Sequence, residues 1–198
     1  MATRADSILK EVYTKLKLNN ASDTVKYSHI NRIVNELARI NKKSTIHEKT
    51  TGTISERLCE LALKSVVSKL YKRITGDWNW MADFSVYGHP FNLLVSVKSF
   101  KAKERLLASG SGNNLSPIVG WGLFDDRTEW SSKKRIEMYL YRSFLAIYLP
   151  VRLYEELPKY LRDITNINGR PFLRQIDLFP EDIVNAVGGK DYIDVTIF

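Results

Sequence analysis

The stretch from Phe91 to Ser99 constrains the fold more than any other part of this sequence. Its run Phe91-Asn92-Leu93-Leu94-Val95-Ser96-Val97 is apolar at most positions and does not alternate regularly between apolar and polar residues. A strand buried on both faces has this composition, whereas a strand with one face in water alternates. We therefore expect an α/β fold in which a central mixed β-sheet is flanked by helices.

Other segments fit further strands of such a sheet. Ala82 to Tyr87 is a short strand, and Gly88-His89-Pro90 joins it to the Phe91–Ser99 strand in the manner of a hairpin turn. Phe144 to Leu149 is an apolar strand closed by Pro150, and Tyr192 to Phe198 is predicted as a final strand.

Helices are predicted where apolar residues recur at intervals of three and four. The predicted helices are Asp6 to Leu18, a helix capped by Ser28 that carries Ile30 to Ile40, a helix from Thr53 or Ser55 to about Arg73, Lys101 to Ala108, Val151 to about Leu161, and Asp177 to Val187. Asn41 to Gly52 and Ser109 to Asn114 are expected to be loops. No repeat or domain boundary is visible, so residues 1–198 are expected to form a single domain.

Composition excludes several classes of protein. The sequence has no run of eighteen apolar residues, and Met1 to Lys10 lack the apolar stretch of a secretory signal. Cys59 is the only cysteine, which excludes an intramolecular disulfide and a zinc site built on several cysteines. We expect a protein of the reducing cytoplasm, without a membrane partner.

The charge of the chain points to a polyanionic partner. The formal net charge is +8 and the pI is near 9.5. Basic residues concentrate around Lys42 and Lys43, between Lys98 and Arg105, and in Lys133-Lys134-Arg135. Because any one of these clusters could also be a solvated surface, charge alone leaves the function open.

The helix after Gly52 carries acidic residues in an unusual setting. Apolar residues lie on two of its faces, and Glu56 and Glu60 fall within the second apolar stripe. A carboxylate in such a position is costly unless a cation or hydrogen bonds compensate it. The alternative is that both glutamates lie at the solvated margin of the helix, with Glu60 paired to Lys64.

The predicted hairpin adds two further charged groups. Asp83 stands near the start of the first strand and Lys98 near the end of the second, where a lysine is unusual in a buried strand. Two carboxylates can hold Mg²⁺, which lowers the pKa of a bound water, and a lysine can offset charge that develops on a phosphate. Oxygen ligands without nearby cysteine or histidine favour Mg²⁺, with Mn²⁺ as a substitute, over zinc.

The order of these residues resembles the PD-(D/E)XK nuclease superfamily, which includes type II restriction endonucleases and archaeal Holliday junction resolvases. The resemblance covers about Gly52 to Phe100, roughly a quarter of the chain, within a catalytic core of about residues 52–150. It implies a restriction-endonuclease-like mixed sheet, Mg²⁺ dependence, and products with 5′-phosphate and 3′-hydroxyl ends. Asp83 matches the motif aspartate, Lys98 the motif lysine, and Glu56 the glutamate of the preceding helix. Val97, which can offer only main-chain oxygen, joins Asp83 and Glu56 as an expected metal ligand.

The sequence departs from the family pattern at two positions. Ala82 stands where the motif often has proline, which has no chemical role. Ser96 stands where the motif usually has an acidic residue, so a carboxylate must come from elsewhere or the site is inactive. The candidates to replace it are Glu56, which we favour, then Glu60 and Glu104.

The resemblance implies a type II restriction endonuclease that cuts double-stranded DNA at a short site as a homodimer, with a cognate DNA methyltransferase in the same system. The alternatives are a structure-specific nuclease such as a Holliday junction resolvase and a non-catalytic DNA-binding protein. Segments outside the core, at both ends of the chain, would serve DNA recognition or dimerisation. The residues expected to contact DNA are Lys42, Lys43, His47 and Lys49, then Lys101 and Lys103, and, around a C-terminal turn, Arg170, Arg174 and Gln175.

The tryptophans near the hairpin are expected to have a structural role. We predict that Trp78, Trp80 and Met81 pack under the hairpin rather than serving as platforms for base stacking. Trp121 and Trp130 flank a polar Asp125-Asp126-Arg127 turn, a possible hinge or dimer contact.

Overall fold

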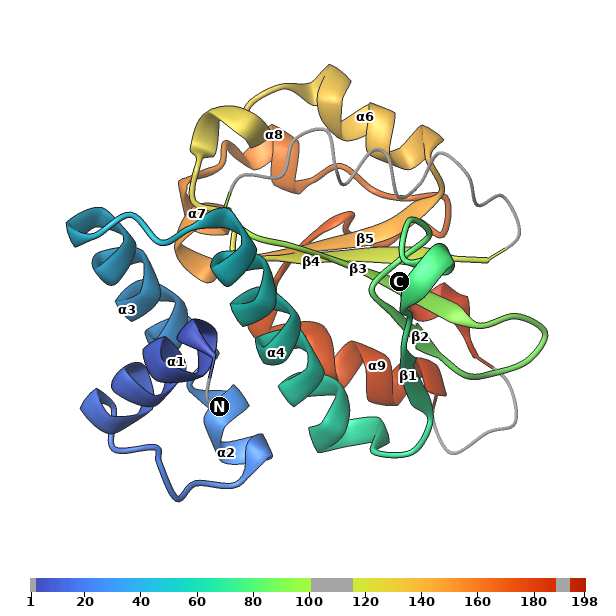
Figure 1. The fold of residues 1–198 in the computed structure, drawn as a ribbon. Coiled ribbons are helices and arrows are strands. Elements are labelled where there is room, and N and C mark those ends of the chain that lie inside the picture. Colours follow the sequence, from blue (N-terminus) through green and yellow to red (C-terminus); the bar gives the residue numbers. More distant parts are fainter. Residues whose placement is uncertain (1–2, 101–115, 188–192) are drawn as a thin grey trace.

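A computed structural model describes residues 3–100, 116–187 and 193–198 of the chain (Figure 1). Within these residues a six-stranded mixed sheet has its strands in sequence order, β1 to β6. The strands are β1 (Tyr71–Arg73), β2 (Phe84–Val86), β3 (Leu93–Lys98), β4 (Ile118–Gly122), β5 (Phe144–Leu149) and β6 (Leu173–Gln175). β1 pairs with β2, and β2 with β3, in antiparallel fashion, whereas β3, β4, β5 and β6 pair in parallel. The expected α/β class with a central mixed sheet is confirmed.

Helices cover both faces of the sheet, as the composition of β3 predicts (Figure 1). Val95 and Val97 of β3 join the core on one face, and Leu94 joins the core on the other. The first core contains α1 (Arg4–Lys15), α2 (Asp23–Ser28), α3 (Ile30–Lys43), α4 (Glu48–Val67) and α9 (Phe179–Val187). The second contains α6 (Lys133–Tyr141), α7 (Val151–Glu156) and α8 (Lys159–Arg162).

The helices of the N-terminal half begin and end at other residues than expected. Ser28 ends α2 and does not cap α3, which begins at Ile30. The expected loop from Asn41 to Gly52 is short, because α3 reaches Lys43 and α4 begins at Glu48. His47 caps α4, since its side chain accepts a hydrogen bond from the amide of Lys49.

The end of α4 also differs from the prediction. The helix ends at Val67 rather than near Arg73, because residues Tyr71–Arg73 form β1 and pair with β2. The edge strand β1 thereby lies directly after α4, which packs against β3 in the centre of the sheet. This arrangement brings the charged residues of α4 and β1 toward the same end of the β2–β3 hairpin.

The C-terminal half contains elements that the sequence pattern did not predict, namely β4, α6 and β6. The helix predicted from Val151 to Leu161 is divided into α7 and α8, because Pro158 cannot continue a helical hydrogen-bond pattern. The predicted final strand is wrong at residues Val195–Ile197, which form a 3₁₀ turn. The strand predicted at Phe144–Leu149 is confirmed as β5. The segments predicted as Lys101 to Ala108 and Ser109 to Asn114 lie outside the described residues.

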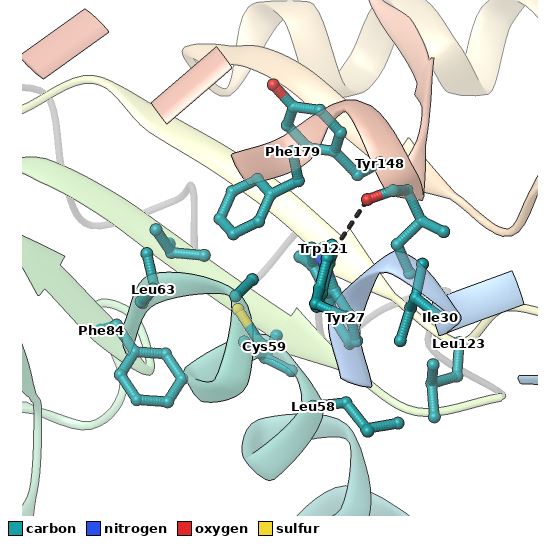
Figure 2. Packing of buried hydrophobic residues seen from close by; sticks show 14 of the residues in the cluster. Tyr27, Ile30, Leu58, Cys59, Leu63, Phe84, Trp121, Leu123, Tyr148 and Phe179 are labelled. Atoms are coloured by element: carbon teal, nitrogen blue, oxygen red, sulfur yellow. Dashed lines mark hydrogen bonds between the residues drawn. The ribbon is translucent and has the colours of Figure 1, made fainter. Parts of the chain in front are cut away.

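A buried hydrogen-bond chain joins the N-terminal helices to the sheet (Figure 2). Trp121 Nε1 of β4 donates to the hydroxyl of Tyr27 at 3.1 Å, and this hydroxyl donates to the carbonyl of Ile176 at 2.7 Å. Tyr27 and Trp121 are buried, so water cannot replace either partner. These two hydrogen bonds hold α2 against β4 and against the segment before α9. No helix in the described part of the chain is both long and apolar enough to cross a bilayer.

Removal of the Tyr27 hydroxyl tests this connection. Tyr27→Phe leaves Trp121 Nε1 and the Ile176 carbonyl buried without their partner, so we expect the free energy of unfolding to fall by about 1–3 kcal/mol. Urea denaturation measures the change. Tyr141→Phe is the matched control, since Tyr141 is 85% exposed. Equal losses in both variants would show that the buried chain does not contribute.

Candidate active site

Asp83 is held at the start of the hairpin by the backbone of β3. It precedes β2, and its amide donates to the carbonyl of Val95 at 3.0 Å. Its carboxylate Oδ2 accepts a hydrogen bond from the amide of Val97 at 2.6 Å. The orientation of the carboxylate is therefore set by main-chain groups of the neighbouring strand, which are fixed within the sheet.

Lys98 ends β3 and lies beside the same carboxylate. Its ammonium Nζ is 3.5 Å from Asp83 Oδ2, and the two side chains are 14% and 23% exposed. Both groups are thus largely sheltered but still reach solvent, as a substrate-binding site requires. The structure brings these two predicted site residues together.

Glu56 of α4 is the third member of the group. Its carboxylate forms an ion pair with Arg73, the last residue of β1. Burial raises the pKa of Glu56, and the negative charge of Asp83 raises it further. The positive charges of Arg73 and Lys98 lower this pKa and so oppose the rise. Glu56 is therefore close enough to both Asp83 and Lys98 to be influenced by their charges.

This arrangement fits a divalent cation held mainly by substrate and water. In residues 3–100, 116–187 and 193–198 there is no group of three or more histidine, cysteine or acidic side chains that could hold a metal ion. Mg²⁺, however, is commonly bound by one or two carboxylates, several waters and the phosphates of the substrate. Asp83 and Glu56 supply two such carboxylates, and Val97 could add only its carbonyl oxygen. A cation beside Glu56 would also offset the cost of its partly buried charge.

The remaining candidates for the missing acid are placed less favourably. Ser96, at the position where the motif usually has an acid, is fully buried and offers no ligand to solvent. Glu60 accepts a hydrogen bond from the Tyr71 hydroxyl at 3.1 Å and pairs with Lys64 at 3.7 Å, the pairing expected for a residue at the helix margin. Glu104 lies outside the described residues. Glu56 is thus the described glutamate best placed to act with Asp83.

The residues expected to contact DNA fall into two described groups. Lys42, Lys43, His47 and Lys49 are exposed around the connection between α3 and α4. Lys101 and Lys103 lie outside the described residues. In the C-terminal group, Arg170 is exposed and donates to the carbonyl of Thr196 at 3.2 Å, and Gln175 is half-buried at the end of β6.

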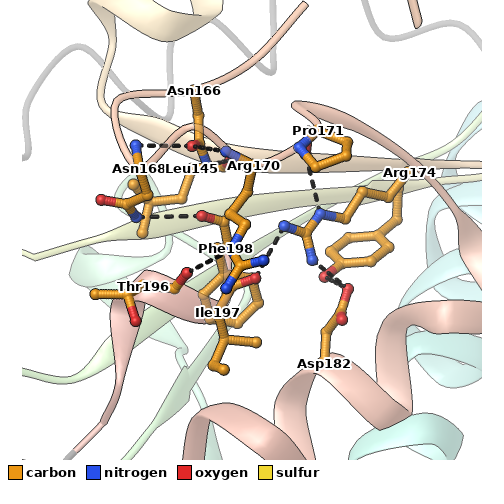
Figure 3. A network of polar contacts seen from close by, with 11 residues as sticks. Leu145, Asn166, Asn168, Arg170, Pro171, Arg174, Asp182, Thr196, Ile197 and Phe198 are labelled. Carbon is orange, nitrogen blue, oxygen red and sulfur yellow. Dashed lines mark hydrogen bonds and ion pairs between the residues drawn. The ribbon is translucent and has the colours of Figure 1, made fainter. Parts of the chain in front are cut away.

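Arg174 has a structural position instead. It is 8% exposed, its Nη1 bonds Asp182 at 2.7 Å, and its other nitrogens donate to the carbonyls of Pro171 and Ile197 (Figure 3). The guanidinium therefore ties β6 to α9 and to the C-terminal turn. Arg174 is not available to a DNA groove in this arrangement, which removes it from the expected contacts.

The two tryptophans of the turn before Asp83 are exposed. Trp78 is 65% exposed and Trp80 is 49% exposed, so the prediction that they pack under the hairpin is wrong. Met81 follows the prediction, since it packs against the core on the α6 side of the sheet. Trp121 and Trp130 are buried and form no hinge surface. Nothing in the local pattern distinguishes the exposed pair from the buried pair.

Comparison of the chain with protein-family models, with curated proteins and with solved structures found no match. The chemistry of Asp83, Lys98 and Glu56, and the motif that their order in the sequence resembles, are therefore the basis of the functional proposal.

The raised pKa of Glu56 predicts a particular pH dependence of stability. A carboxyl whose folded pKa is raised binds its proton more tightly in the folded chain, so its ionisation lowers stability as the pH rises above the ordinary glutamate range. We expect Glu56→Gln to become progressively more stable relative to wild type between about pH 4 and pH 7. Loss of the pair with Arg73 reduces this difference but does not reverse its sign, because burial is the larger influence on the pKa of Glu56 and Arg73 is 48% exposed.

Urea denaturation in the absence of divalent metal measures this difference at each pH. Glu155→Gln, on the exposed surface of α7, is the matched control and should follow the wild-type profile. If Glu56→Gln also ran parallel to wild type, burial of the Glu56 carboxylate would have no energetic consequence.

Proposed function

We propose that this chain is a Mg²⁺-dependent endonuclease that hydrolyses phosphodiester bonds in double-stranded DNA. The contact between Lys98 and Asp83, beside the partly buried carboxylate of Glu56, carries the proposal. One ammonium and one carboxylate at the end of the hairpin, with a second carboxylate from α4, provide the groups that metal-assisted phosphodiester hydrolysis requires. The resemblance to the PD-(D/E)XK motif supports the same chemistry.

Each side chain has a separate task in this proposal. Asp83 and Glu56 would hold Mg²⁺, or Mn²⁺ in its place, with the carbonyl of Val97 as a further oxygen. The bound cation would supply positive charge to the phosphate and lower the pKa of a water. Lys98 would orient the attacking water and stabilise negative charge that develops on the phosphate oxygens. The Val97 amide would keep Asp83 in position throughout, since it bonds Oδ2 directly.

The finer proposal is a type II restriction endonuclease that acts in the cytoplasm with a cognate DNA methyltransferase. A homodimer would place two such sites around a two-fold axis and so cut both strands of a symmetric site. Lys42, Lys43, His47 and Lys49 would bind the DNA backbone, as would Lys101 and Lys103. Arg170 and Gln175 remain candidates for base contacts.

A structure-specific nuclease is the second candidate. The exposure of Trp78 and Trp80 favours it, because exposed indole rings can stack on bases that are not paired in a duplex. The two candidates share the chemistry of Asp83, Lys98 and Glu56 and differ in the DNA that they bind.

Cleavage assays with site variants test the shared chemistry. With Mg²⁺, wild type should cut duplex or branched DNA, and Asp83→Asn and Lys98→Ala should each lower the rate by roughly 100-fold or more. Asp83→Asn retains a carbonyl oxygen that can accept the bond from the Val97 amide, so the hairpin should be preserved. DNA affinity without metal should change little in either variant.

Asp77→Asn and Lys159→Ala serve as controls, since both residues are exposed and neither belongs to the group of Asp83, Lys98 and Glu56. They should cut like wild type. The site assignment would be wrong if Asp83→Asn or Lys98→Ala retained wild-type cleavage, and the proposed activity would be wrong if wild type cut no DNA with Mg²⁺ or Mn²⁺.

A further inference from the structure

The turn between β1 and β2 presents two large aromatic rings to solvent. The amide of Ile74 donates to the carbonyl of Asp83 at 2.9 Å, which closes a turn of residues 75–82. Within it Trp78 and Trp80 are 65% and 49% exposed. Indole rings normally find apolar cover or a partner, so two of them exposed in one turn indicate a binding surface.

The turn itself is well anchored. Residues Gly76–Trp78 form a 3₁₀ turn that begins at Gly76 with φ of 70°, a conformation that favours glycine. The amide of Met81 donates to the carbonyl of Trp78 at 3.0 Å, and Ala82 is buried in the core below. The exposure of the rings therefore belongs to an ordered turn rather than to a frayed loop.

The turn that carries the rings is joined directly to Asp83 of the candidate active site. Consecutive Cα atoms are about 3.8 Å apart, so the Cα atoms of Trp80 and Asp83 are separated by at most about 11 Å. A phosphate bound at Asp83 and Lys98 would therefore lie within a few residues of the turn that carries Trp78 and Trp80. The turn is thus placed beside the expected path of a bound strand.

The surrounding charge favours nucleic acid over a second protein copy as the partner. Between Glu60 and Asp77 the chain has no acidic residue but four basic ones, Lys64, Lys69, Lys72 and Arg73. Lys72 of β1 is exposed three residues before this turn, and among the described residues its side chain has no ion pair, whereas Lys69 lies beyond the other end of β1. Aromatic rings and basic residues on one surface are the combination by which proteins hold unpaired nucleic-acid strands, through base stacking and contacts to phosphates.

We propose that Trp78 and Trp80 form a stacking platform for unpaired DNA bases next to the scissile phosphate. The position of the scissile phosphate rests on the proposed nuclease function, whereas stacking of bases on the two rings does not require cleavage. The substrate class is DNA with unpaired nucleotides beside the cut, such as a bulge, a flap or a branch point.

Tryptophan fluorescence in EDTA tests the platform without cleavage. Trp121 and Trp130 are 0% and 1% exposed, so quenching by added DNA reports mainly on Trp78 and Trp80. The probes are a single strand, its perfect duplex, and the same duplex with a short central bulge. We expect the single strand and the bulged duplex to quench the fluorescence and to bind more tightly than the perfect duplex.

Substitution of the rings then measures their contribution. Trp80→Leu and Trp78→Leu should each weaken binding of the bulged duplex by roughly 5- to 150-fold, and Trp80→Phe should restore part of the affinity. Tyr141→Leu, which removes a different exposed aromatic ring, should bind the bulged duplex like wild type. Circular dichroism and the melting temperature establish that each variant is folded.

Several outcomes would overturn the platform. Unchanged fluorescence on binding, equal affinity of the leucine variants and wild type, or conversion of a dimer to a monomer in these variants with DNA affinity intact would each reject it. Failure of the nuclease proposal is distinguishable, because quenching and ring-dependent binding without any cleavage would reject that proposal and support the platform. Cleavage that does not depend on either ring would reject the platform alone.

Discussion

The hydrogen bond from the Val97 amide to the Asp83 carboxylate, 2.6 Å long, fixes the centre of the candidate site. It joins the residue that precedes β2 to the penultimate residue of β3, one position before Lys98. Val97 is buried and pairs with Trp121 of β4, so the sheet holds the amide that binds Asp83. The 3.5 Å approach of the Lys98 ammonium to the Asp83 carboxylate follows from this arrangement.

Glu56 lies among charges of both signs at this end of the hairpin. Its carboxylate is partly buried near the negative charge of Asp83, and both effects raise its pKa. Arg73 supplies a positive charge from the edge strand, and Lys98 supplies another from β3. A phosphate with its metal ion would find donors and acceptors already held in place, which lowers the cost of organising them during a reaction.

The sequence predicts the hairpin and its two charged residues because these depend on local pattern. The continuous apolar run of β3 and the Gly88-His89-Pro90 turn suffice to bring Asp83 near Lys98. β4 is missed because two glycines interrupt its pattern, and Gly122 is required by the ring of Phe124, which packs where a side chain would lie. The Glu56–Arg73 ion pair depends on the pairing of β1 with β2, and the buried position of Arg174 depends on the pairing of β6 with β5. No local pattern specifies these pairings.

Anomalous X-ray scattering from crystals of the protein soaked in Mn²⁺ tests the central claim most directly. It locates the ion without reference to activity or to any particular DNA. A Mn²⁺ peak within coordination distance, about 2.0–2.3 Å, of both the Asp83 and Glu56 carboxylates is the predicted result. A peak bound only by other residues, or none at Asp83 with the hairpin intact, would contradict the assignment of this site.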